Sequence, residues 1–346
     1  MFGLSSLSVA QKKDVSVITL NECWKYRSPD IMNLRPAVDS SNLYIAEGGG
    51  RISAISLSSG TRLWSTELGG EIRSNIAVQG PNVFVAASDA SKRMRLRALS
   101  ITSGIPTSDV EIPFSTAVRV ESVGARLIVA IDSGYLAAFN IGGQKPEWQT
   151  TITGLDISNM VMLNDKLVAA AADKTIRVIS LTDGKVIQSS TVENTVSALN
   201  VFEGNIVVGD SHGNLTRYYD DYRTVYWRFR NGARISSLAS TDRGVLAASL
   251  DNFVYMTAGY FGDVRWKRRM AGRVSSIVVS GDVAVVLTVG EPNAIILNLD
   301  NGKPVGELSI SEDDSFTQPT IVSGQELLFF TSGNVMAEST QPCSLK

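Results

Sequence analysis

The chain has 346 residues, of which 44% are hydrophobic and 19% charged, so it can bury a large core and its composition excludes a disordered protein. Its 32 basic and 34 acidic residues give a net charge of −2, which argues against binding nucleic acid or a membrane surface along the whole chain. One histidine, His212, and two cysteines, Cys23 and Cys343, leave few residues for a metal site or for histidine-assisted catalysis.

A short apolar segment recurs along the whole chain and predicts a repeat. It begins at Asn42 (NLYIA), Asn82 (NVFVA), Arg126 (RLIVA), Lys166 (KLVAA), Asn205 (NIVVG), Gly244 (GVLAA), Asp282 (DVAVV) and Glu326 (ELLFF). The steps between these starts are 38 to 44 residues, a period typical of β-propeller blades. Each segment is a continuous apolar run, as in a strand that is buried on both faces. We therefore count eight units.

A second pattern follows each apolar segment and predicts a hairpin. It consists of a strand, a turn with Asp or Ser beside Gly, and another strand, as in AISLSSGTRLW from Ala54 and VISLTDGKVIQ from Val178. All five tryptophans stand on the strand after such a turn. We expect their large rings to pack between neighbouring blades. Together with an inner strand before the apolar segment, each unit has four antiparallel strands.

The two ends of the chain complement each other. The last unit, from about Thr317 to Thr340, supplies three strands, and the first 32 residues supply one outer strand with Trp24. We predict an all-β, single-domain, eight-bladed β-propeller in which this N-terminal strand completes the eighth blade, so that the ring has no open seam. We predict that residues 1–14 are flexible and that residues 15–32 form the outer strand of blade eight. Blades one to seven are predicted at residues 33–71, 72–116, 117–156, 157–195, 196–234, 235–273 and 274–316. Residues 317–346 are predicted to form the rest of blade eight and the tail.

Closure of the ring makes a prediction about the cysteines. Aligning the repeats places Cys23 at the position of Leu63 and Cys343 at the position of Gly60. These two positions flank one tight hairpin turn, so the cysteines should lie near the range that a disulfide tolerates. Two free thiols are the alternative. A disulfide would indicate an oxidising compartment.

The repeat resembles those of the PQQ-like (quinoprotein-type) β-propellers, and in particular the BamB-like branch of that superfamily. The segment NIVVGDSHGNL, from Asn205 to Leu215, and the last unit, SFTQPTIVSGQELLFFTSGNV, carry the closer resemblance. It implies a non-enzymatic scaffold with protein partners in an envelope assembly complex, and a role in outer-membrane protein assembly. It also implies a periplasmic or envelope location with a signal removed; a cytoplasmic location is the alternative, since MFGLSSLSVAQKK resembles no signal peptide.

Two other functions remain open. One is a PQQ-binding quinoprotein, although the adjacent cysteine pair and the calcium shell of those enzymes have no counterpart here, and the acidic run Glu312, Asp313 and Asp314 reads as a loop. The other is a ligand-sensing or regulatory propeller. We expect no catalytic residues, cofactor or metal, no nucleic acid partner, no transmembrane segment, and a monomer. The longest apolar stretch is broken at Ser280, Gly281 and Asp282.

Blades five and six are the unusual part of the surface. Between Arg217 and Arg273 there are eleven basic and five acidic residues, a local balance of +6. The candidate partner contacts in this segment are aromatic and arginine residues, the types that are enriched at interface hot spots: Tyr218, Tyr219, Tyr222, Tyr226, Arg228 and Arg230. The alternative is that charged outer strands prevent aggregation between sheet edges. A second candidate is the long hairpin SDASKRMRLR of blade two, with Lys92, Arg93 and Arg95.

Overall fold

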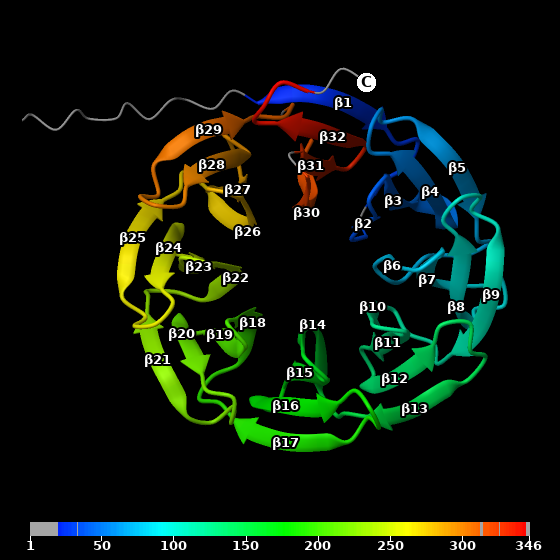
Figure 1. Ribbon diagram of the computed structural model, residues 1–346, viewed down its shortest axis with the longest axis horizontal. Coiled ribbons are helices and arrows are strands. Elements are labelled where there is room, and N and C mark those ends of the chain that lie inside the picture. Colours follow the sequence, from blue (N-terminus) through cyan, green and yellow to red (C-terminus); the bar gives the residue numbers. More distant parts are fainter. Residues whose placement is uncertain (1–19, 33, 312–313, 325, 344–346) are drawn as a thin grey trace, which may run out of the picture.

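Eight four-stranded antiparallel sheets form a closed ring in the computed structural model, which describes residues 20–32, 34–311, 314–324 and 326–343 (Figure 1). The first four blades are blade one with β2 (Ala37–Val38), β3 (Asn42–Glu47), β4 (Arg51–Ser56) and β5 (Arg62–Glu67); blade two with β6 (Ala77–Gln79), β7 (Asn82–Ser88), β8 (Met94–Ser100) and β9 (Pro106–Ile112); blade three with β10 (Val118–Val123), β11 (Arg126–Ile131), β12 (Tyr135–Asn140) and β13 (Pro146–Thr151); and blade four with β14 (Leu155–Leu163), β15 (Lys166–Ala171), β16 (Thr175–Ser180) and β17 (Val186–Thr191). One short 3₁₀ turn, η1 (Gly48–Gly50), joins β3 to β4.

The other four blades continue around the ring in sequence order. They are blade five with β18 (Val196–Phe202), β19 (Asn205–Asp210), β20 (Asn214–Tyr218) and β21 (Val225–Arg230); blade six with β22 (Ile235–Thr241), β23 (Gly244–Ser249), β24 (Phe253–Ala258) and β25 (Val264–Arg269); blade seven with β26 (Arg273–Ser280), β27 (Val283–Val289), β28 (Ala294–Asn298) and β29 (Pro304–Leu308); and blade eight with β30 (Phe316–Ser323), β31 (Glu326–Thr331), β32 (Asn334–Ser339) and β1 (Asn21–Arg27). The all-β eight-bladed propeller is thus confirmed. The segment 1–14 lies outside the described residues.

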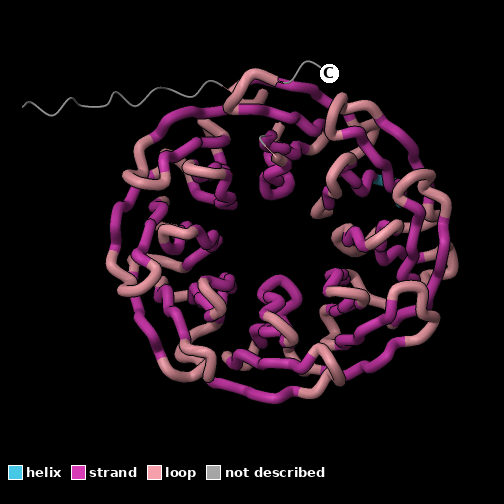
Figure 2. Tube along the Cα trace, in the orientation of Figure 1, coloured by secondary structure: helices cyan, strands magenta, loops and turns pink. Residues whose placement is uncertain are grey.

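The strand order explains the sequence pattern. The first strand of each blade faces the centre of the ring and the fourth strand forms the outer rim (Figure 2). The second strands carry the recurring apolar runs, and their burial is nearly continuous from the second residue onward. Because each of these strands lies inside its sheet and between two neighbouring blades, both of its faces are covered, which favours a continuous apolar run over alternation.

The five tryptophans connect neighbouring blades, as the sequence predicts. Each indole Nε1 donates a hydrogen bond of 2.6–3.0 Å to a backbone carbonyl of the next blade. Each ring also lies against a glycine of that blade's outer hairpin. At Gly184, whose φ is +71°, an added Cβ would come within 2.4 Å of Trp148 Cε3. The pairs are Trp24 with Gly60, Trp64 with Gly104, Trp148 with Gly184, Trp227 with Gly262 and Trp266 with Gly302.

The N-terminal strand β1 closes the ring by pairing antiparallel with β32. The register places Trp24 opposite Ala337 and Arg27 opposite Asn334. Trp24 also donates a 2.7 Å hydrogen bond to the carbonyl of Leu57 in blade one, so β1 joins blade eight to its neighbour as well. The closing blade is therefore built from both ends of the chain.

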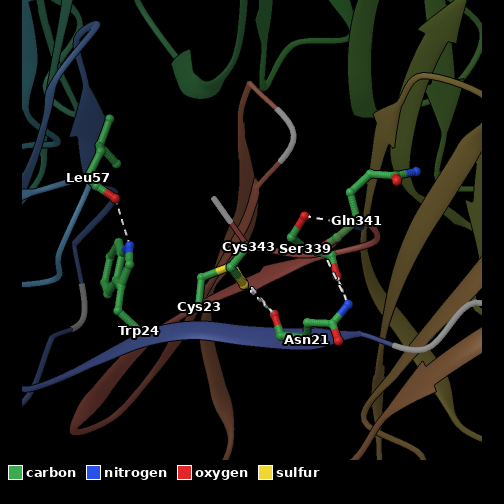
Figure 3. The surroundings of a disulfide bond; sticks show 7 residues. All are labelled: Asn21, Cys23, Trp24, Leu57, Ser339, Gln341 and Cys343. Atoms are coloured by element: carbon green, nitrogen blue, oxygen red, sulfur yellow. Dashed lines mark hydrogen bonds between the residues drawn. A yellow bond between two sulfur atoms is a disulfide. The ribbon is translucent and has the colours of Figure 1, made fainter. Parts of the chain in front are cut away.

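A disulfide joins Cys23 and Cys343 beside this seam (Figure 3). Their Cα atoms are 5.4 Å apart although 320 residues separate them in sequence. Cys23 belongs to β1, and Cys343 follows β32. Asn21 strengthens the same junction, because its side-chain amide donates to the carbonyls of Ser339 and Gln341, each at 3.4 Å. The covalent bond thus holds the N-terminal strand to the C-terminal end of blade eight.

A buried carboxyl group at the seam makes the stability depend on pH. Glu338 is 4% exposed and lies opposite Glu22. Burial, together with the charge of Glu22, raises the pKa of Glu338 to about 7. The folded protein therefore keeps a proton that the unfolded chain releases above its ordinary pKa of 4.5, so folding stability falls as pH rises from about 4.5 to 7 and stays low above that.

We expect Glu338→Gln to remove this dependence, because the amide carries no charge to bury. At pH 8 the variant should be more stable than the wild type by about 3 kcal/mol, and at pH 4.5 the two should be nearly equal. Urea unfolding at both pH values measures the difference. Glu22→Gln is the matched control and should give a smaller gain, because burial of Glu338 remains. Equal unfolding midpoints at pH 8 would contradict the assignment.

Candidate docking surface on blades five and six

The structure divides the candidate tyrosines of blade five into two groups. Tyr218 and Tyr222 are 7% and 3% exposed and pack in a core cluster with side chains of blade four, including Val168 and Val178. Burial raises the pKa of both phenols. Tyr222 fills the space between the two blades where most blades carry a tryptophan and blade four carries Gln188. These two rings therefore cannot touch a partner, and we withdraw them from the candidate surface.

The other two tyrosines belong to an aromatic cluster at the surface, which we define as Tyr219, Tyr226, Tyr260 and Phe261. The Tyr219 and Tyr226 rings are 4.6 Å apart between centroids. The buried Arg217 guanidinium lies 4.6 Å from the Tyr226 ring and 5.9 Å from the Tyr260 ring. This arginine links rings of two blades by cation–π contacts.

Hydrogen bonds hold Arg217 in this position. It is 4% exposed, and its Nη1 donates to the carbonyl of Gly259 at 2.7 Å. Its Nη2 lies 3.3 Å from the Glu203 carboxylate, which also accepts a 3.0 Å hydrogen bond from the Tyr260 hydroxyl. That hydrogen bond and the charge of Glu203 raise the pKa of Tyr260. These contacts tie the Tyr260 ring to the buried Arg217 and to Glu203.

The hairpin tip of blade six departs from the repeat. The corresponding tips of blades one, two, four and seven read Leu-Ser-Ser-Gly, Ile-Thr-Ser-Gly, Leu-Thr-Asp-Gly and Leu-Asp-Asn-Gly, whereas blade six reads Gly-Tyr-Phe-Gly from Gly259 to Gly262. Tyr260 and Phe261 are 58% and 78% exposed. Since four other blades fold with small polar residues there, packing does not require these rings. Comparing the tips in the sequence would have found Tyr260 and Phe261, which our candidates lacked.

The outer strands of the same two blades carry a row of cations, which we call the basic rim: Arg228 and Arg230 on β21, and Arg265, Lys267 and Arg269 on β25. All five side chains are exposed. Arg228 forms an ion pair of 3.1 Å with Glu193. The other four have no carboxylate partner among the described residues. Among all the described residues, ten arginines form no ion pair. Seven of these ten lie between Arg223 and Arg273.

The blade-two hairpin differs, because its charges are neutralised internally. Arg93 pairs with Asp89 at 3.0 Å. Arg95 pairs with Asp109 and, at 3.5 Å, with Glu111. Lys92 stands at the tip of the turn with a φ of +59°. Two of the three candidate cations are thus engaged within their own sheet, so this hairpin presents a weaker field to a partner than the basic rim does.

The single histidine and the aspartates in turns serve local structure. Asp210 accepts hydrogen bonds from the backbone amides of His212 and Asn214, and Asp173 accepts in the same way from the amide of Thr175. Asp132 accepts from the hydroxyls of Ser115 and Thr116. Asp314 accepts from Ser332, while Glu312 and Asp313 lie outside the described residues. No group of three or more potential metal ligands occurs in the described part of the chain. In that same part, no helix is long and apolar enough to cross a membrane.

Comparison with known proteins now assigns the family. The model of a PQQ-repeat family described as outer membrane protein assembly factor BamB matches residues 13–107 and 92–218, together more than half of the chain. The chain belongs to this BamB family. The outer membrane protein assembly factor BamB of Yersinia pestis is 20% identical over 93% of this chain and 96% of its own length.

Solved structures show that the ring shape extends beyond the BamB family. BamB from Moraxella catarrhalis superposes with a TM-score of 0.73 at 17% identity, covering 93% of this chain and 98% of its own. The computationally designed Ika8 protein superposes with a TM-score of 0.76 at 13% identity, covering 92% of this chain and 99% of its own. The C-terminal WD40 domain of Sif2 superposes with a TM-score of 0.74 at 14% identity, covering 93% of this chain and 99% of its own. At these identities the structural likeness establishes the fold alone.

Proposed function

We propose that this protein is a non-enzymatic scaffold in the assembly of outer-membrane proteins and works in the periplasm or at the envelope. Membership of the BamB family supports the process. The disulfide between Cys23 and Cys343 supports an oxidising compartment. The observation that carries the scaffold role is the surface of blades five and six, where exposed aromatic rings on the hairpin turns lie beside arginines without an ion pair on the outer strands. Such residues are enriched in protein interfaces.

Deleting the gene in the organism that encodes it tests this role. We expect the amount of folded β-barrel proteins in the outer-membrane fraction to fall at least twofold, and the wild-type chain supplied in trans to restore it. The readout is the heat-dependent gel shift of folded barrels, and the level of a soluble periplasmic protein is the control. Unchanged barrel levels would contradict the proposed process. A redox-active complex formed on adding PQQ and calcium would contradict the non-enzymatic part.

A further inference from the structure

We infer that the outer strand β25 of blade six binds an acidic, extended segment of a partner protein by adding it as a fifth strand to the blade. The inference deepens the proposed scaffold role and rests on it, because it names the chemistry of the partner. It is carried by two observations on the same strand: a row of cations that form no ion pair, and a backbone edge that pairs with no other strand among the described residues.

The cations of β25 are arranged for a strand. Arg265, Lys267 and Arg269 are all exposed and alternate with the buried Trp266 and the half-buried Arg268. Lys267 and Arg269 lie opposite Tyr255 and Phe253 in regular register, whereas Arg265 is the extra residue of a β-bulge between Val264 and Trp266. Alternate residues in the regular part of a strand point to the same side and repeat at about 7 Å. An extended chain with carboxylates at alternate positions has the same repeat, so two of its carboxylates can meet Lys267 and Arg269, with Arg265 adding positive charge at the bulge.

The packing of β25 leaves its outer edge free. Trp266 donates a 2.7 Å hydrogen bond to the carbonyl of Leu299, and Arg268 donates a 2.7 Å hydrogen bond to the carbonyl of Gly302. Both contacts fix the strand against blade seven. In the sheet, β25 pairs only with β24, and it lies on the outer rim of the ring (Figure 1). The opposite backbone edge can therefore accept another strand without displacing any part of the blade.

Protection against edge-to-edge aggregation does not explain this charge pattern. Charge of either sign would protect an edge, yet β17 carries no charged residue and exposes Val186 and Ile187. Five other outer strands contain at least one acidic residue besides any basic ones: β1, β5, β9, β13 and β29. Only β21 and β25, among the outer strands, carry several cations and no acid. The restriction of β21 and β25 to positively charged residues indicates an anionic partner.

The composition favours a protein over a lipid surface. Between Arg223 and Arg273 the cations are nine arginines and one lysine. Arginine binds carboxylates through two parallel hydrogen bonds, and it is enriched with tyrosine at protein interfaces, whereas lysine is depleted there. The aromatic cluster on the neighbouring hairpin tip, with Phe261 78% exposed, adds an apolar anchor beside the charged strand.

Fluorescence anisotropy with labelled peptides tests the inference on the full chain. The probe is the octapeptide Glu-Thr-Glu-Val-Glu-Thr-Glu-Val. Two comparison peptides carry Lys in place of every Glu, or Pro in place of every Thr and Val, which prevents pairing as a strand. We expect the acidic probe to bind at least tenfold more tightly than the lysine peptide and at least fivefold more tightly than the proline peptide. Raising KCl from 50 to 300 mM should weaken its binding.

The variant Arg265→Glu with Arg269→Glu should weaken binding of the probe at least tenfold. Neither side chain makes an ion pair or hydrogen bond within the described residues, so the fold should tolerate both changes. The matched control is Lys92→Glu with Lys145→Glu, which makes the same charge change at exposed hairpins of blades two and three and should alter binding less than twofold. Equal weakening by both variants, or equal binding of the proline peptide, would overturn the inference.

Cosedimentation with vesicles of phosphatidylglycerol and phosphatidylcholine separates the two anionic partners. Binding to these vesicles that depends on Arg265 and Arg269, without binding of the acidic probe, would overturn the inference in favour of a lipid surface. If the acidic peptide does not bind, the result of the gene deletion still tests the scaffold role. If the gene deletion leaves barrel levels unchanged, the peptide affinities still test the binding site on β25. The two proposals can therefore fail separately.

Discussion

Replacing Cys23 and Cys343 together by serine should lower the free energy of unfolding by about 4–5 kcal/mol. The disulfide closes a loop with a sequence separation of 320 residues, and in the unfolded chain such a closure removes many conformations that the reduced chain regains. Urea unfolding of the oxidised wild type and the double variant measures the difference, read from the midpoint and the slope.

The single variants provide the control for this prediction. Cys23→Ser and Cys343→Ser should each lose as much stability as the double variant, because either change removes the whole bond. Dithiothreitol should shift the wild type to the same midpoint and leave the double variant unmoved. Two titratable thiols in unreduced, denatured protein, or a wild-type midpoint that dithiothreitol does not change, would disprove the stabilising role of the bond.

Replacing Trp148 by alanine should destabilise the protein by about 3–5 kcal/mol, the second large effect that we expect. Trp148 is 9% exposed, lies on Gly184 and donates a 3.0 Å hydrogen bond to the carbonyl of Leu181. Alanine leaves a cavity between blades three and four, and the Leu181 carbonyl keeps only the longer 3.4 Å hydrogen bond from Arg126. Trp148→Phe should cost less, about 1–2 kcal/mol, since it keeps part of the packing and loses the hydrogen bond.

Blade four offers a matched control at the same position of the repeat. Its outer strand carries Gln188, which lies opposite Val178 as Trp148 lies opposite Ala138. Because the buried Tyr222 fills this junction from the other blade, Gln188→Ala should cost less than about 1 kcal/mol. The same urea experiment applies to all three variants. A loss at Gln188→Ala as large as at Trp148→Ala would show that the inter-blade tryptophan is not the source of the effect.

The repeat made most of the fold predictable. The apolar segments, the glycine turns and the tryptophans recur with one period, so an error in one blade is corrected by the other seven. The pairing of β1 with β32 followed from counting strands at the two ends of the chain, and the structure confirms that closure. The packing of the tryptophans between neighbouring blades was predictable for the same reason, whereas the structure showed that each ring lies on a glycine of the next blade.

The candidate surface was less predictable, because alternation along a strand does not show which neighbour covers a side chain. Tyr218 and Tyr222 stand among charged residues in the sequence, yet blade four covers them. The sequence Gly-Tyr-Phe-Gly in blade six indicates two exposed aromatic rings, but this is apparent only when the hairpin tips of the blades are compared. Ion pairing could not be read from composition either, since the partners of Arg95 and Arg228 are remote in sequence.

The number of blades, the four strands of each, the closure of the ring by its first strand and the packing of the tryptophans between blades could all be predicted from the sequence alone. These features depend on local patterns and on a period, and both are written along the chain. The folded structure was needed to show which arginines form no ion pair, which tyrosines are buried between blades, and that Glu338 is buried at the seam. Each of these depends on groups from neighbouring blades or from the far end of the chain, which come together only when the ring closes.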